Sequence, residues 1–316
     1  MPMRNAALYV RAAAASVLQE RSVPLELVVV DDGSTDNGVE ILHSLGDSRL
    51  RVVPGPQQGI AACMNAGLDA ARGDVIMRCD ADDLYPAGRI ARQVELLADH
   101  PDWIAVCGAF QMIDTTDRVL AQPFDDAVST SHVLITDELC AGTMRTHLCT
   151  FAMRRHACLA VKGFRSYFQT AEDLDFAFRL AELGPIAFVS QNFLLYRIHG
   201  ASITHTQPSP RRVFFDQVAQ RFAKQRAETG GDDLQRGNPP APPQAKEAAP
   251  HNASQHILGL LQGSAWQHFA QGRYWNAFVD GLAAVRRYPL EFRAWSSLFR
   301  LSVKCLIRSL VRSPMP

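Results

Sequence analysis

The sequence predicts an α/β protein with a mainly parallel sheet and helices on both of its faces. Short apolar, β-branched runs typical of buried strands recur in the first half of the chain, with helical patterns between them and glycine-containing turns at their ends. Strands that alternate with helices form βαβ units, whose strands end on one rim of the sheet. The predicted strands are 25–30, 49–54, 75–77, 103–113, 151–155 and 193–198, and the predicted helices are 6–20, 37–45, 60–71, 87–99 and one that begins near residue 172.

Carboxylates follow two of these strands at the point where each strand ends. They are Asp31 and Asp32 after residues 25–30, and Asp80, Asp82 and Asp83 after residues 75–77. In open α/β sheets, ligands bind outside the carboxyl ends of the strands, so we expect both acidic segments to belong to one site. Hard cations such as Mg²⁺ and Mn²⁺ take oxygen ligands and often hold substrate phosphates. The alternative is that these Asp residues build turns and cap the following helices.

A third acidic pair, Glu172-Asp173, opens the last predicted helix of the first half. Thr170 and Asp173 have the spacing of a capping box, and an apolar stripe follows at helical spacing. The plain interpretation of this segment is therefore a capped helix start.

Six short motifs occur in order along about residues 2–205. They are Pro2-x-x-Asn5, Val28-Val-Val-Asp-Asp-Gly-Ser34, Gly59-Ile-Ala…Asn65-x-Gly67, Asp80-Ala-Asp-Asp83, Glu172-Asp173 and Tyr196-Arg-Ile-His199. This ordered set resembles the family 2 glycosyltransferases, which have the GT-A fold. The resemblance implies an inverting transfer of sugar from a nucleotide donor to a hydroxyl acceptor on a glycan or lipid-linked glycan. The donor is expected to be UDP-linked because of Asp32. It also implies a place in surface polysaccharide or lipopolysaccharide biosynthesis.

The resemblance implies a role for each motif residue. Asp173 is the expected general base. The expected ligands of Mn²⁺ or Mg²⁺ are Asp82, Asp80 and His199. The expected nucleotide-binding residues are Asn5, Asp31, Asp32, Asn65 and Asp80. The residues expected on the acceptor or diphosphate side are Asp83, Glu172, Arg197 and His147.

In the resembled family an apolar strand precedes the Pro-x-x-Asn motif, whereas this sequence starts at Met1-Pro2-Met3-Arg4-Asn5. We therefore expect a truncated first strand, explained either by a start site upstream of Met1 or by an inactive chain. Two alternative functions stay open: a sugar nucleotidyltransferase, and a catalytically impaired, membrane-associated binding subunit. An early Gly-rich basic phosphate loop, usual in the former, is not found in the sequence, and the retained Asp80, Asp82 and Asp173 argue against the latter.

Composition limits the other classes of function. The formal net charge is +0, which argues against a nucleic-acid partner. The seven cysteines are scattered and include no Cys-x-x-Cys, which favours reduced thiols in a cytoplasmic protein over disulfides or a zinc site. No signal-peptide pattern opens the sequence.

The C-terminal third is predicted to be helical and to add no motif to the site. Residues 1–205 form the expected catalytic domain, 206–227 a helix packed on it, 228–251 a Pro/Gly-rich linker and 252–316 a helical extension. Residues 291–312 combine apolar and basic residues at helical spacing. Such a helix either lies on the inner membrane surface as a peripheral element or packs on the protein with a solvated basic edge.

Overall fold

The computed structural model describes residues 1–119, 131–199, 209–243, 253–270 and 272–311, and the chain divides into two compact units. Unit 1 comprises Met1–Phe110, Phe124–Tyr196 and Ser209–Lys246. Unit 2 comprises Gln111–Pro123, Arg197–Pro208 and Glu247–Pro316. The units therefore interleave along the chain, whereas the sequence predicts consecutive domains.

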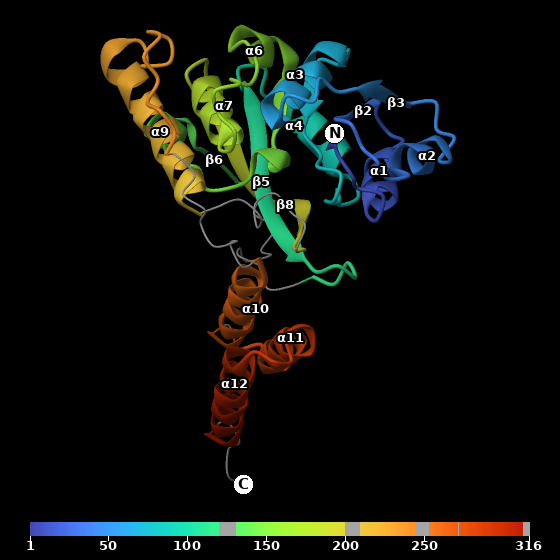
Figure 1. The fold of residues 1–316 in the computed structure, drawn as a ribbon, viewed down its shortest axis with the longest axis vertical. Helices are drawn as coiled ribbons and strands as arrows, with labels where there is room; N and C mark the ends of the chain where they lie inside the picture. Colours follow the sequence, from blue (N-terminus) through green and yellow to red (C-terminus); the bar gives the residue numbers. More distant parts are fainter. Residues whose placement is uncertain (120–130, 200–208, 244–252, 271, 312–316) are drawn as a thin grey trace. The chain divides into compact units, whose positions relative to one another are not determined.

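Unit 1 contains a three-stranded parallel sheet in the order β1-β2-β3 (Figure 1). The side chains of its central strand alternate between two apolar clusters, as the pleat requires. Leu27 and Val29 pack with the first helix of the chain, and Val28 and Val30 pack with Cys63 of the third. The elements are β1 (Pro2–Met3), α1 (Val10–Leu18), β2 (Leu27–Asp31), α2 (Gly38–His43), β3 (Leu50–Pro54) and α3 (Ile60–Ala70).

The first strand is short, as expected from the sequence. β1 contains only two residues, which pair with Val30 and Asp31 of β2, and the amino group of Met1 donates to the carbonyl oxygen of Val28 at 2.8 Å. Among the described residues, no ladder joins β1 to the second sheet. Helix α1 is shorter than the predicted 6–20, because residues 6–9 form the turn before it.

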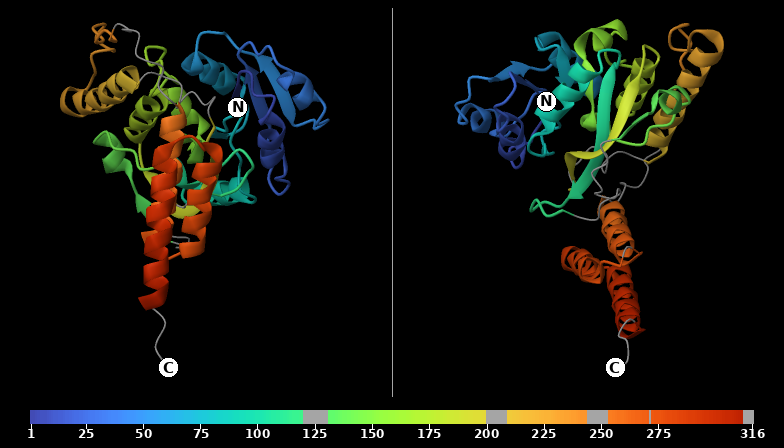
Figure 2. Two further views of the ribbon diagram at one scale, coloured as in Figure 1. Left: turned by 60° about the horizontal axis from the view of Figure 1, so that its bottom comes forward. Right: turned by 180° about the vertical axis from the view of Figure 1, so that it is seen from behind.

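The second sheet of unit 1 has the strand order β4-β7-β5-β8-β6. Its β4–β7, β5–β7 and β6–β8 pairs are antiparallel, whereas both pairs of the first sheet are parallel. β5 and β8 lie side by side (Figure 2). The strands are β4 (Val75–Met77), β5 (Ala105–Ile113), β6 (His132–Leu134), β7 (Ala152–Arg154) and β8 (Ile186–Arg197), the last beginning before the predicted residue 193.

Helices cover both faces of the second sheet, as the sequence predicts (Figure 1). Ala105, Cys107 and Ala109 of β5 belong to the apolar cluster formed with α5, α6, α7 and α9. Val106, between them, belongs to the cluster formed with α4. The helical elements are α4 (Arg89–Asp99), α5 (Thr136–Cys140), η1 (Leu148–Thr150), α6 (Arg155–Ala160), α7 (Glu172–Ala181) and α9 (Ser209–Thr229).

Part of the stretch predicted as a linker packs in unit 1 instead. The Asp232 side chain is fully buried and forms ion pairs at 2.7 Å with Arg165 and with Arg226 of α9. The Tyr167 hydroxyl donates to the Pro240 carbonyl oxygen at 2.7 Å. These buried contacts outweigh the local preference of a Gly- and Pro-rich segment for an extended, solvated chain.

Unit 2 contains the helices α10 (Ala253–Ala270), α11 (Tyr274–Arg287) and α12 (Phe292–Val311), which lie in the stretch predicted as a helical extension. Ala265, Phe269, Ala277 and Leu301 form their shared core. The turn after β5 joins this unit through an ion pair of 3.5 Å between Arg118 and Asp280. Among the described helices, none has the length and apolar character needed to cross a bilayer.

Candidate active site

Backbone amides hold the carboxylates at the end of β2. The Oδ1 atom of Asp32 accepts from the Gln57 amide at 2.7 Å, and the Oδ1 atom of Asp31 accepts from the Ser34 amide at 3.1 Å. Gly55 passes so close that a Cβ atom there would lie 2.7 Å from Asp32 Oδ1. The buried Asp32 carboxylate is therefore fixed between β2 and the turn after β3.

Asn5 and Asn65 fix two other loops of unit 1. The Asn5 side-chain oxygen accepts from the Thr35 amide at 2.7 Å, which ties the turn after β1 to the turn after β2. Asn65 exchanges two hydrogen bonds with the backbone of Phe164, at 2.8 and 2.7 Å. Both polar atoms of the Asn65 amide thus anchor the loop before α7, and the nucleotide contact expected of this residue stays a prediction.

Arg78 organises the acidic segment after β4, and the sequence analysis did not single it out. Its Nε atom donates to Asp80 Oδ1 at 2.8 Å, and its Nη2 atom donates to Asp80 Oδ2 at 3.1 Å. Burial alone would raise the pKa of Asp80, but the Arg78 charge and its hydrogen bonds outweigh burial and hold that pKa below the usual value. Asp80 is therefore an ionised carboxylate at neutral pH.

The same guanidinium joins the Asp80 segment to the start of α7. Arg78 Nη1 lies 3.3 Å from Glu172 Oε1, 94 residues further along the chain. Burial, and then the charge of Asp173, raise the pKa of Glu172 to about 7. The structure thus brings together the second and third acidic motifs, as the sequence predicts, and places a cation between them.

The start of α7 differs from the predicted capping box. The residue before the helix is Ala171, which has a left-handed backbone with φ of 61°, and no side chain caps the helix. Asp173 Oδ1 instead accepts from the amide of Leu174 at 2.9 Å. A positive φ is unfavourable for a residue with a Cβ atom, so the loop packing imposes this conformation. Its effect is to place both acids in the first helical turn.

His147 belongs to the same group of charges. Its ring stacks on Tyr196 with ring centroids 4.8 Å apart, and it meets the edge of Phe110 at 4.7 Å. Burial lowers the pKa of His147, while the nearby charges of Asp173 and Asp80 oppose that shift. His147 therefore lies near Asp80 and Asp173, and its ring is held by aromatic neighbours.

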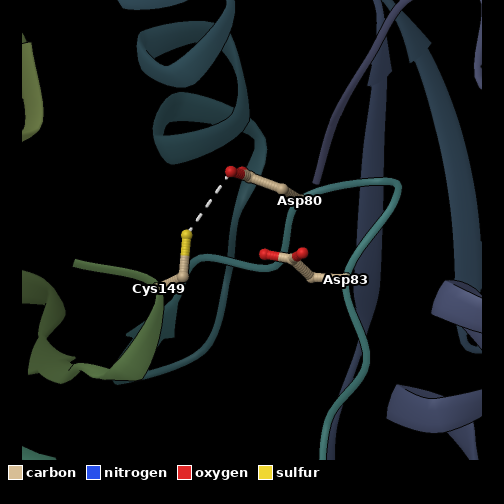
Figure 3. Close-up of side chains that lie close together, drawn as sticks. All are labelled: Asp80, Asp83 and Cys149. Carbon is tan, nitrogen blue, oxygen red and sulfur yellow. Dashed lines mark hydrogen bonds between the residues drawn. The ribbon is translucent and has the colours of Figure 1, made fainter. Parts of the chain in front are cut away.

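Asp80, Asp83 and Cys149 could hold a metal ion, since one ligand atom from each lies within 4.8 Å of the others (Figure 3). The Cys149 thiol donates to Asp80 Oδ2 at 3.5 Å. Burial raises the pKa of this thiol well above its usual value, with the Asp80 charge adding to the shift. A protonated thiol is a poor ligand, so the carboxylates fit a hard cation such as Mg²⁺ or Mn²⁺ better than a thiolate-seeking metal.

Three predicted residues, Asp82, Arg197 and His199, are not members of this group. Asp82 is half-buried and is not a member of the Asp80–Asp83–Cys149 group. Arg197 and His199 are buried and belong to unit 2, where Arg197 contacts Asp114 and Asp117.

A buried scaffold holds the Asp80 segment in place. Tyr85 donates to the Arg78 carbonyl oxygen at 2.7 Å, and the Arg89 guanidinium lies 3.7 Å from the Tyr85 ring centroid. Arg89 also donates to the Cys149 carbonyl oxygen at 2.6 Å. A sequence signal for Arg78 existed, because alternate residues of an extended chain share one side and Arg78 is two positions from Asp80.

Comparison with known proteins identifies the family of this chain. Residues 1–159 match the family model for glycosyl transferase family 2. An uncharacterized glycosyltransferase of Nostoc sp. is 29% identical over 209 residues, which are 63% of this chain and 63% of the relative. The chondroitin synthase of Pasteurella multocida is 27% identical over 206 residues, which are 63% of this chain and 20% of that protein.

The fold is shared with a solved structure. The crystal structure of S. aureus TarS 1-349 in complex with UDP-GlcNAc matches 71% of this chain and 65% of that chain, with a TM-score of 0.58 and 17% identity. The α/β fold class predicted from the sequence, and its helical C-terminal region, are confirmed. The match to the family model over half of the sequence shows that this chain belongs to glycosyl transferase family 2.

Proposed function

We propose that this chain is an inverting glycosyltransferase that moves a sugar from a nucleoside-diphosphate donor, UDP-linked, to a hydroxyl acceptor. One observation carries the proposal: Arg78 contacts both Asp80 and Glu172, which are distant in sequence, and the charges of Asp173 and His147 interact with this group. A partly buried group of charged side chains at strand and helix termini is typical of a catalytic site. The setting that we propose is cytoplasmic assembly of a surface glycan.

Asp173 is the general base in this proposal. It stands in the first turn of α7, half-buried, next to the raised-pKa carboxyl of Glu172. Its carboxylate takes the proton of the acceptor hydroxyl while the acceptor oxygen bonds to the anomeric carbon. The bond from that carbon to the diphosphate oxygen breaks on the opposite side, which inverts the configuration.

The acids after β4 would hold a divalent cation beside the donor diphosphate. Asp80, Asp82 and Asp83 are the proposed ligand sources, and their hard oxygens favour Mn²⁺ or Mg²⁺. When bound, the cation offsets the negative charge that grows on the leaving diphosphate. Arg78 keeps Asp80 ionised and oriented through two hydrogen bonds.

Asp32 supplies the base specificity of the proposed donor site. Its carboxylate is held through Oδ1 by the Gln57 amide, and the loop beside it is held by Asn5. A fixed carboxylate accepts the imide N–H of uracil or thymine, whereas guanine offers it a different set of donors. UDP-GlcNAc in TarS, which has the same fold, is consistent with this assignment.

Nucleotide-dependent thermal stability of the full chain tests the donor site. We expect UDP with Mn²⁺ to raise the Tm, UDP alone to raise it less, and GDP to have no effect. Sugar transfer with UDP as the product is then the expected reaction; release of pyrophosphate would instead indicate a nucleotidyltransferase.

Asp173→Asn tests the base. We expect it to lower kcat at least about 10²-fold while leaving the UDP-induced Tm shift intact, since a positioned base contributes about 10²–10⁴-fold. Asp216→Asn on α9, whose carboxyl is also partly buried, is the matched control and should keep near-normal turnover. Near-normal turnover of Asp173→Asn would overturn the assignment.

A further inference from the structure

Four large apolar side chains on α12 are exposed. Phe292, Trp295, Phe299 and Val303, here called the apolar stripe, are 82%, 53%, 70% and 40% exposed. Spacings of three and four residues place them along one side of a helix. The buried residues Ala294 and Leu301 mark a different side, which packs in the core of unit 2. The apolar stripe therefore lies outside the core of the described part of unit 2.

Cations accompany the apolar stripe. Arg293, Arg300 and Lys304, here called the cationic flank, are exposed and each lies one position after a stripe residue. At 100° per residue this places them along one edge of the stripe. The sequence from Phe292 to Val311 contains no Asp or Glu. The described surface of α12 is therefore apolar along one line and positive beside it.

The turn before α12 extends the same surface character. Leu290 is 97% exposed, and Arg286 and Arg287 at the end of α11 are exposed. The Trp295 indole N–H donates to the Pro289 carbonyl oxygen at 2.9 Å, which fixes this turn against the first turn of α12. The exposed side chain of Leu290 therefore lies on a turn that a hydrogen bond holds in place.

We propose that α12 binds the surface of an anionic lipid bilayer. Its apolar stripe inserts at the boundary between headgroups and acyl chains, and the cationic flank contacts lipid phosphates. Large exposed apolar patches mark interaction surfaces, and the uniform positive charge selects an anionic partner. A second copy of the chain fits less well, because a two-fold interface through this stripe brings two cationic flanks together.

Vesicle co-sedimentation of the full chain tests this surface. We expect binding to phosphatidylglycerol/phosphatidylcholine vesicles, roughly tenfold or more weaker binding to pure phosphatidylcholine, and loss of binding as salt is raised. Equal partitioning into both vesicle types, or binding to neither, would overturn the proposal.

Paired variants separate the two parts of the surface. Phe292→Ser/Phe299→Ser should weaken binding to anionic vesicles roughly tenfold or more at any salt concentration, and Arg293→Gln/Arg300→Gln should weaken it and flatten its salt dependence. Trp295 and Lys304 stay unchanged, because Trp295 fixes the turn and the Lys304 amine lies 5.2 Å from the Trp266 ring.

Matched controls use exposed residues of unit 1. Leu159→Ser/Leu183→Ser and Arg21→Gln/Lys224→Gln change the same chemistry at other exposed sites and should leave binding unchanged. Loss of binding in the controls as well would overturn the assignment to α12. A dimer in solution that only Phe292→Ser/Phe299→Ser dissociates, without vesicle binding, would assign the stripe to a second copy instead.

Discussion

The two acidic strand ends of unit 1 have similar sequences but hold their carboxylates in different ways. After β2, the carboxylates of Asp31 and Asp32 accept from the backbone amides of Ser34 and Gln57. After β4, the carboxylate of Asp80 is held by the Arg78 guanidinium. Backbone amides are neutral donors whose positions follow from the backbone conformation, whereas the Arg78 guanidinium is a side chain that carries a positive charge.

At the β2 end hydrogen bonds from backbone amides fix the position of the carboxylates, whereas at the β4 end a positive side chain also balances their charge. Neutral donors can hold either a carboxylate or an amide oxygen, so charge matters little for the shape of the β2 end. At the β4 end, Arg78 balances Asp80 and Glu172 together, so removal of one partner leaves buried charge uncompensated. Substitutions at the two ends should therefore differ in both size and pH dependence.

Removal of Arg78 should have the largest effect. Arg78→Met leaves Asp80 and Glu172 without their shared cation, and we expect it to lower the free energy of unfolding by about 3 kcal/mol. Arg78→Lys keeps the charge but not the fork of donors, and should recover only part of the loss. Urea unfolding measures both. Arg92→Met, which breaks the exposed pair with Glu95, should cost less than about 0.5 kcal/mol; an equal cost for Arg78→Met would contradict this account.

Gly55→Ala should be the most damaging small change at the β2 end. The added Cβ would lie 2.7 Å from Asp32 Oδ1 and 2.8 Å from Asp32 Cα, so the backbone must shift. We expect a loss of about 2 kcal/mol in unfolding free energy together with a weaker UDP-induced Tm shift. Gly73→Ala is the control, because its Cβ would meet only ordinary contacts at 3.6 Å. Similar behaviour of the two variants would show that Asp32 is not held by close packing.

Asn substitutions compare the two ends directly. Asp32→Asn retains an oxygen for the Gln57 amide, so we expect a stability loss under about 1 kcal/mol. Asp80→Asn removes the charge that faces Arg78 and should cost about 1–2 kcal/mol more. Thermal and urea unfolding of the two variants, side by side, measure the difference. Equal losses at both positions would contradict the proposed distinction.

The smallest effect should be on the pH dependence of stability. The pKa of Glu172 is raised from 4.5 to about 7 in the folded protein. Below pH 4.5 the carboxyl is protonated in both states. Between these values the unfolded state loses the proton first, so the stability contribution of Glu172 falls as the pH rises to about 7 and then levels off. Glu172→Gln should remove this slope, as urea unfolding at a series of pH values would reveal. A slope unchanged in Glu172→Gln would assign it to another group.

Sequence reasoning succeeded where local pattern and final environment agree. The strand at 75–77 has the bounds that its residues predict, and the helix predicted at 60–71 ends one residue earlier. It failed where distant partners decide the conformation. The prediction of a capping box at Thr170 was wrong because loop packing places Ala171 in a left-handed conformation. The segment predicted as a linker is anchored because Asp232 forms ion pairs with Arg165 and Arg226.

The sequence by itself determined the α/β class, the family and the acidic motifs, because hydrophobic period and motif order are properties of neighbours along the chain. Only the tertiary structure showed that Arg78 joins Asp80 to Glu172, that Asn65 anchors the loop before α7, and that the apolar stripe of α12 lies exposed. Ion pairs, amide contacts and exposure depend on segments that are distant in sequence, and no local pattern specifies which distant side chain will arrive.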